Sequence, residues 1–201
     1  MILGTEAETK PLDMVETLRK KMKSLALAEA ILSPEWEYRY FSYDSKWSEA
    51  EEVASMRDGS GNHWFLWLCR DLAAYKCCSL DDGLAGDVEG VKSTFPHEYR
   101  GFLDEPAFSM GEATCIWRWG GSEWIKHGLA VRDMVDLERV VAWTADDYGS
   151  WARAYYEIDI DGTCLQRLFD GEFSERLAMK LNPDVDLVQL KSDMEEIGIT
   201  P

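Results

Sequence analysis

The chain has 201 residues, of which 46% are hydrophobic, so it is long and apolar enough for one folded domain and is not a disordered chain. Asp and Glu total 38 against 21 Lys and Arg, which gives a formal net charge of −17 distributed along the sequence. Such a field repels nucleic-acid phosphates and anionic lipid, and it speeds encounter with a basic partner. We therefore expect neither nucleic acid nor membrane as a partner.

The N-terminal sequence and the cysteines bear on location. The first residues lack the basic region and apolar run of a signal peptide, and no stretch approaches the ~20 apolar residues of a membrane span. The five cysteines are odd in number and lack the spacing of a disulfide framework. These features predict a cytoplasmic protein with reduced thiols.

A helix is predicted over residues 11–32. Apolar side chains recur there at steps of three and four, and only Glu29 interrupts the apolar stripe. Pro34 ends this helix, because a proline disfavours helical geometry in the residue before it.

An antiparallel meander is predicted next, because the pattern changes to period two. In its first strand Trp36, Tyr38 and Tyr40 would share one face. The runs DGSGN and RD provide tight turns, and the continuous apolar run HWFLWLC indicates a central strand. The four expected strands cover residues 36–41, 51–57, 63–69 and 72–78.

The middle of the chain adds a loop, a short helix and a hairpin. Residues 81–95 are rich in Gly and Asp and are predicted as a loop, and residues 96–103 as a short helix. The sequence TCIWRW-GGS-EWIKHG, which covers residues 114–128, predicts a β-hairpin.

Helices are predicted in the C-terminal part. Thr144 and Asp147 resemble a capping box, Ser174 is a candidate N-cap, and Gly198 is a candidate C-cap. The elements together indicate an α+β fold, with an antiparallel meander sheet of about six strands packed against N-terminal and C-terminal helices. We expect a single domain over residues 1–201, with an ordered core over about 10–199.

The run EIDIDGTCLQRL, residues 157–168, partly matches a calcium loop. Glu157, Asp159 and Asp161 occupy the first, third and fifth places. The twelfth place, however, holds Leu168 where a bidentate Glu is required. We therefore interpret the run as an Asp-Gly turn between a helix and a strand.

No metal, cofactor or catalytic motif is evident. The histidines (His63, His97 and His127) have no acidic or Cys partner at ligand spacing, and the vicinal Cys77 and Cys78 would point to opposite faces of a strand. Nucleophile-elbow, P-loop and dinucleotide patterns are absent from the sequence. We predict no metal, cofactor or catalytic residues, although a site assembled from distant segments stays open.

The aromatic residues are expected to divide between core and surface. Most of the nine tryptophans should be buried, since each large ring buries ~150–250 Å². A minority, edged by carboxylates, would form a binding surface for a protein. The residues expected to bind that partner are Trp36, Tyr38, Glu49, Glu51, Glu52 and Asp58.

The segment SPEWEYRYFSYDSKWSEAEEVASMRDGSGNHWFLWL, residues 33–68, resembles a stretch of uncharacterised small acidic bacterial proteins. In these a helix ending in SPEW leads into aromatic strands and an ASMRDGSG-like turn. The resemblance extends loosely to CIWRW and LNPD, and it implies no activity. In acidity and helix–meander–helix order the chain is also similar to the SUKH superfamily of bacterial toxin-immunity proteins.

The leading functional hypothesis is a non-enzymatic binding protein of immunity or antitoxin type, whose acidic, aromatic surface binds a basic protein. Two alternatives stay open. One is a homo-oligomeric structural protein, and the other is a small-molecule-binding enzyme whose site is built from scattered residues.

Overall fold

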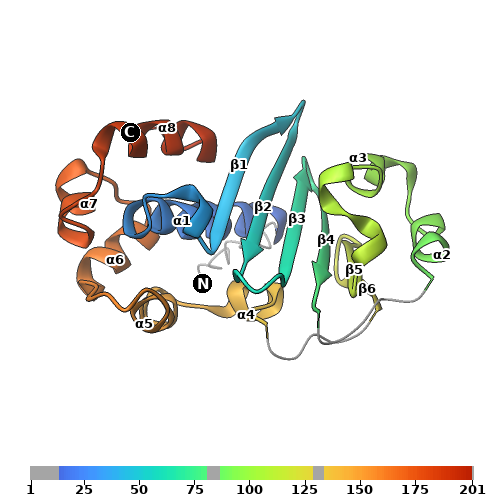
Figure 1. Ribbon diagram of the computed structural model, residues 1–201. Coiled ribbons are helices and arrows are strands. Elements are labelled where there is room, and N and C mark those ends of the chain that lie inside the picture. Colours follow the sequence, from blue (N-terminus) through green and yellow to red (C-terminus); the bar gives the residue numbers. More distant parts are fainter. Residues whose placement is uncertain (1–13, 81–86, 129–133, 201) are drawn as a thin grey trace, which may run out of the picture.

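A six-stranded antiparallel sheet forms the centre of the computed structural model, which describes residues 14–80, 87–128 and 134–200 (Figure 1). Its strands follow one another in chain order, so the predicted meander and α+β class are confirmed. The strands are β1 (Phe41–Ser48), β2 (Glu51–Arg57), β3 (His63–Cys69), β4 (Leu72–Cys78), β5 (Cys115–Trp119) and β6 (Trp124–Gly128).

Helices cover both faces of this sheet (Figure 1). The first face packs on the N-terminal helix and on the C-terminal helices, as predicted. The helices on this face are α1 (Met14–Leu32), α4 (Leu137–Ala142), α5 (Ala145–Tyr156), α6 (Gly162–Phe169), α7 (Glu175–Leu181) and α8 (Leu187–Ile197).

The second face packs on a smaller layer from the middle of the chain. This layer holds two short α-helices and three 3₁₀ turns and contributes Phe102 and Phe108 to a separate apolar cluster. Its elements are α2 (Val88–Ser93), η2 (His97–Tyr99), α3 (Arg100–Leu103), η3 (Pro106–Phe108) and η4 (Met110–Glu112). Because both faces are covered, β3 is apolar on both sides, as its sequence indicated.

The loop predicted for residues 81–95 is partly wrong, because α2 lies within it. Asp87 caps α2 by accepting a hydrogen bond from the Gly90 amide. Residues 81–86 lie outside the described residues, as do residues 10–13 at the start of the predicted core and helix.

The strand predicted for residues 36–41 is also wrong. Residues 36–38 form a 3₁₀ turn, η1 (Trp36–Tyr38), and β1 begins only at Phe41. The cause is a tertiary contact: the buried Glu29 carboxylate of α1 accepts hydrogen bonds from the backbone amides of Tyr40 and Phe41. Tyr40 is therefore buried, whereas Trp36 and Tyr38 remain exposed.

The Asp-Gly turn at residues 161–162 starts a helix, and the strand predicted after it is wrong. Asp161 accepts hydrogen bonds from the amides of Thr163 and Cys164 and so serves as the N-cap of α6. The three caps that the sequence did predict are confirmed: Thr144 forms a capping box with Asp147, Ser174 caps α7, and Gly198 ends α8 with positive φ.

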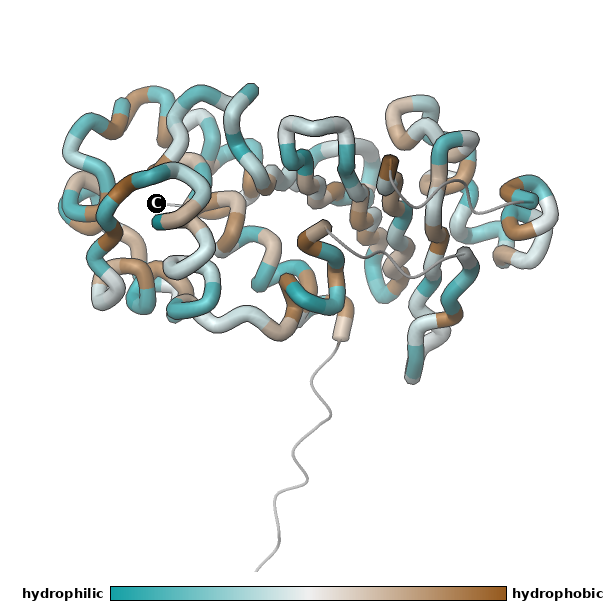
Figure 2. The backbone as a smooth tube through the Cα atoms, turned by 60° about the horizontal axis from the view of Figure 1, so that its bottom comes forward, coloured by the Kyte–Doolittle hydropathy of each residue, from teal (hydrophilic) through white to brown (hydrophobic). Residues whose placement is uncertain are grey.

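Figure 2 shows hydrophilic and hydrophobic segments alternating along the outer helices, as expected for elements with one buried side. None of the helices in the described part of the chain is both long enough and apolar enough to cross a bilayer.

Candidate functional site

The six residues predicted to bind a partner lie at two ends of the β1–β2 hairpin. Glu49, Glu51 and Glu52 are at its turn, whereas Trp36, Tyr38 and Asp58 are at the opposite end, beyond Arg57. Residues 53–57 of β2 separate Glu52 from Asp58, which corresponds to about 20 Å along the strand. The six residues therefore do not form one patch.

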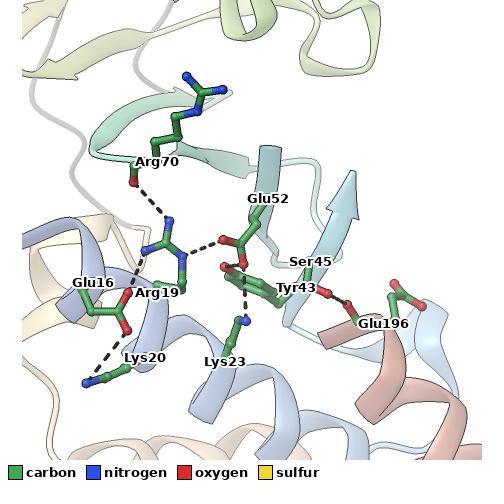
Figure 3. Close-up of polar contacts among 9 residues, drawn as sticks. All are labelled: Glu16, Arg19, Lys20, Lys23, Tyr43, Ser45, Glu52, Arg70 and Glu196. Atoms are coloured by element: carbon green, nitrogen blue, oxygen red, sulfur yellow. Dashed lines mark hydrogen bonds and ion pairs between the residues drawn. The ribbon is translucent and has the colours of Figure 1, made fainter. Parts of the chain in front are cut away.

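Glu52 belongs to a network of charges on the first face of the sheet (Figure 3). Its carboxylate accepts hydrogen bonds from Arg19 Nε at 2.6 Å and from the Tyr43 hydroxyl at 2.6 Å, and Lys23 Nζ lies 3.3 Å away. Burial opposes ionisation of Glu52, but the Tyr43 and Arg19 hydrogen bonds and the Lys23 charge hold its pKa below the ordinary value. Glu52 is thus neutralised internally by α1.

Asp58 is used within its own turn. Its Oδ1 accepts hydrogen bonds from the Ser60 and Asn62 amides, and its Oδ2 accepts one from the Asn62 side chain. These contacts stabilise the β2–β3 turn, so most of the acceptor capacity of Asp58 is already occupied.

Glu51 faces the second side of the sheet, at an open hollow of about 600 Å³. Most of the charged residues that line this hollow are acidic, and Arg100 is the basic residue in its lining. Trp47 is fixed at its wall, where Nε1 donates to Glu105 at 3.3 Å. The hollow and the exposed Glu49 make the hairpin turn acidic but leave it without an exposed large ring among the described residues.

Large rings are exposed at the other end of the hairpin. Trp36 is 49% and Tyr38 62% exposed, and Tyr155 of α5 is 42% exposed. Trp36 lies over the Arg57 guanidinium, with 3.9 Å between Cζ and the ring centroid. The Tyr155 hydroxyl donates a hydrogen bond at 3.4 Å to the carbonyl of Asp58, the residue that follows Arg57. The two rings therefore flank the same short segment of β2 and its turn.

Carboxylates border these rings. Glu35 and Glu37 are exposed on the turn that carries Trp36 and Tyr38. The pKa of the Tyr38 hydroxyl is raised by the charge of Glu37, by a hydrogen bond between Tyr38 and Glu37, and by the charge of Glu35. We call Trp36, Tyr38 and Tyr155, with Glu35 and Glu37 beside them, the aromatic corner.

Buried contacts fix the aromatic corner from below. Glu29 accepts hydrogen bonds from the hydroxyls of Tyr148 and Tyr156 as well as from the Tyr40 and Phe41 amides. Tyr155 stacks on Trp151 with 5.0 Å between ring centroids. From the sequence, Glu29 was noted only as an interruption of the apolar stripe of the first helix. An acidic residue at a core position requires buried hydrogen-bond donors, so this position could have indicated the network.

A second cluster joins residues that the sequence treated as isolated. One ligand atom each from His63, Cys78 and Glu112 lie within 4.8 Å of one another. His63 pairs with Cys78 across β3 and β4, and Glu112 approaches from η4. The two-residue turn Arg70-Asp71 fixes this register, so the opposition of His63 and Cys78 could have been read from the hairpin sequence.

Comparison with protein families, with curated proteins and with solved structures finds nothing that matches this chain.

Proposed function

We propose that this chain is a non-enzymatic binding protein of toxin-immunity or antitoxin type, which binds a basic protein partner through the aromatic corner. The observation that carries the proposal is the pairing of exposed Trp36 and Tyr38 with the flanking carboxylates Glu35 and Glu37. Exposed large rings edged by acidic groups match the anchors and the charge that a cationic protein surface requires.

The two parts of the corner have different roles in this proposal. The net charge of −17 and the local carboxylates draw a basic partner in and speed association, and this effect weakens as salt rises. Trp36 and Tyr38 then insert into the partner and slow its release, because buried aromatic anchors supply most of the binding free energy.

Preorganisation supports the aromatic corner over the hairpin turn as the docking site. The buried Glu29 carboxylate holds the backbone at Tyr40 and Phe41, directly after η1, and Arg57 supports the Trp36 ring. A ring held in place before binding loses little conformational freedom when the partner docks.

The proposal also places the protein in the cytoplasm of a bacterium. All five cysteines lie within the described ranges and are unpaired, which supports a reducing compartment. Nucleic acid is disfavoured as the partner, because the acidic field repels phosphates.

The test is capture from lysate of the native host with wild type and with Trp36→Ala/Tyr38→Ala, at low and high salt. Val188→Ala is the matched control, since Val188 is an exposed apolar residue on α8. We expect wild type and the control to retain the same basic protein, with less recovered at high salt. The purified partner should bind the double variant more weakly by at least about 2 kcal/mol.

Two results would contradict the proposal. One is a wild-type protein that retains no basic protein at low salt. The other is a purified basic partner that binds Trp36→Ala/Tyr38→Ala as tightly as it binds Val188→Ala.

A further inference from the structure

The His63 imidazole has one defined free nitrogen. Its Nδ1 lies 3.0 Å from the Gly61 carbonyl oxygen, which can only accept, so Nδ1 carries the proton and donates. Nε2 therefore presents its lone pair to the cluster. Metal-binding histidines commonly have this arrangement, in which a backbone carbonyl orients the ring through the nitrogen that does not bind the metal.

Lys76 already supplies a cation at this place. Its side chain is fully buried, and Nζ donates to His63 Nε2 at 2.9 Å. Within the described ranges no carboxylate lies within ion-pair distance of Lys76, so the ammonium depends on the imidazole and on the nearby Cys78 and Glu112. The His63 Nε2 lone pair therefore already accepts a hydrogen bond from a cationic group in this cluster.

We propose that His63 Nε2, Cys78 Sγ and a Glu112 carboxylate oxygen form a three-ligand site for Zn²⁺, and that the ion displaces the Lys76 ammonium from His63 Nε2. The mixed nitrogen, sulfur and oxygen donors select Zn²⁺ over Ca²⁺ and Mg²⁺, which prefer oxygen alone. Three protein ligands leave the fourth tetrahedral position for water.

The burial of the three ligands suits an ion that enters from solvent. Cys78 is buried, His63 is half-buried and Glu112 is exposed, so the cluster opens to water on the Glu112 side. The exposed carboxylate lies on the solvent side of the cluster, and the buried thiol lies at its base.

The backbone around the three ligands is fixed by hydrogen bonds. The Asn62 side chain joins Asp58 to the Leu80 amide, which ties the residue before His63 to the chain just after Cys78. The Ser79 amide donates to Thr114 Oγ1 at 2.9 Å, which ties β4 to the segment that follows Glu112. The ligand backbones are therefore positioned before any ion binds.

The test measures Zn²⁺ affinity by competition with a chromophoric chelator and records the absorption spectrum with Co²⁺ in place of zinc. We expect wild type to bind one zinc ion per chain and to show a thiolate-to-cobalt band. Cys78→Ser or His63→Gln should lower the affinity by more than about 100-fold, since even the loss of a supporting partner costs about 10–100-fold. Lys76→Met, which removes the competing ammonium but keeps the buried chain, should raise the affinity by about 10-fold or more.

Two controls separate the site from incidental binding. Cys69→Ser changes a half-buried thiol at the far end of β3, and His97→Ala changes an exposed imidazole. Both should bind zinc as wild type does, and circular dichroism of each variant checks that it is folded. Failure of wild type to bind zinc, retention of affinity in folded Cys78→Ser, or weaker binding by Lys76→Met would overturn the proposal.

Discussion

Arg39 and Asp193, 154 positions apart in the chain, form a buried ion pair with 2.7 Å between Nη2 and Oδ2. Arg39 also donates to the carbonyls of Ser33 and Pro34, which follow α1. The guanidinium thus joins the end of α1, the residue after η1 and helix α8. This contact fixes the chain on which the aromatic corner stands.

Loss of this pair should destabilise the fold strongly. Arg39→Met leaves the Asp193 carboxylate buried without its cation, and we expect the free energy of unfolding to fall by about 3–5 kcal/mol in urea denaturation. Arg167→Met is the control, because it breaks an exposed pair with Glu172 of the same 2.7 Å length and should cost less than about 1 kcal/mol. Equal losses in the two variants would show that the Arg39 pair gains nothing from burial.

Glu29 should stabilise the folded protein more at acid pH than at neutral pH. Burial raises the pKa of this carboxyl above the ordinary value of 4.5, against the opposing effect of its four hydrogen-bond donors. A raised pKa in the folded state means that the folded chain holds the proton more tightly. The contribution of Glu29 is therefore greatest below the ordinary pKa and declines as pH rises through the folded pKa.

Glu29→Gln removes this titration. The free energy of unfolding of wild type, relative to Glu29→Gln, should fall as pH is raised from acid to neutral. Glu29→Ala removes the acceptor of four hydrogen bonds, although the Tyr40 amide keeps the Tyr156 hydroxyl as an acceptor, and it should cost more than about 3 kcal/mol at any pH. Parallel pH profiles for wild type and Glu29→Gln would contradict the expected titration.

Glu52 should stabilise the folded protein more at neutral pH than at acid pH. Its pKa lies below the ordinary value of 4.5, because the Tyr43 and Arg19 hydrogen bonds and the Lys23 charge outweigh burial. Its stabilising contribution is therefore present above the ordinary pKa and is lost as pH falls through the folded pKa. Glu52→Gln should lose about 1–2 kcal/mol at neutral pH and less in acid.

Tyr43→Phe is the control for this carboxylate, because it removes one hydrogen bond and keeps every charge. Urea unfolding at several pH values measures both variants. If Glu52→Gln loses as much stability in acid as at neutral pH, the depressed pKa is not the source of its effect.

Gly128 ends β6 with φ of +101° and lies against β5. A Cβ at this position would approach the Thr114 carbonyl oxygen to 2.3 Å, so Gly128→Ala should combine backbone strain with a steric clash. Gly121→Ala shares a positive φ, +93°, but has nothing within 4 Å of the added carbon. Thermal unfolding should show a loss of about 1–3 kcal/mol for Gly121→Ala and a larger one for Gly128→Ala. Equal losses would mean that β5 moves aside.

Local signals predicted most of the fold. The strands at 51–57, 63–69 and 72–78 alternate or are uniformly apolar and are joined by tight turns, so each pattern and its register are set within a few residues. Caps such as Thr144 and Ser174 bind amides two or three residues away, so they could also be predicted from the sequence. The segment at 36–41 was misread because a carboxylate on the preceding helix, Glu29, binds its amides.

The sequence by itself determined the acidic charge, the meander and the helix caps at Thr144, Ser174 and Gly198, because these depend on composition and on neighbours in the chain. Only the tertiary structure decided which carboxylates remain available to a partner. Glu52 is neutralised by α1, whereas Glu35 and Glu37 stay exposed beside Trp36. It likewise decided that Glu112 meets His63 and Cys78, since contacts between segments far apart in sequence arise only when the layers pack.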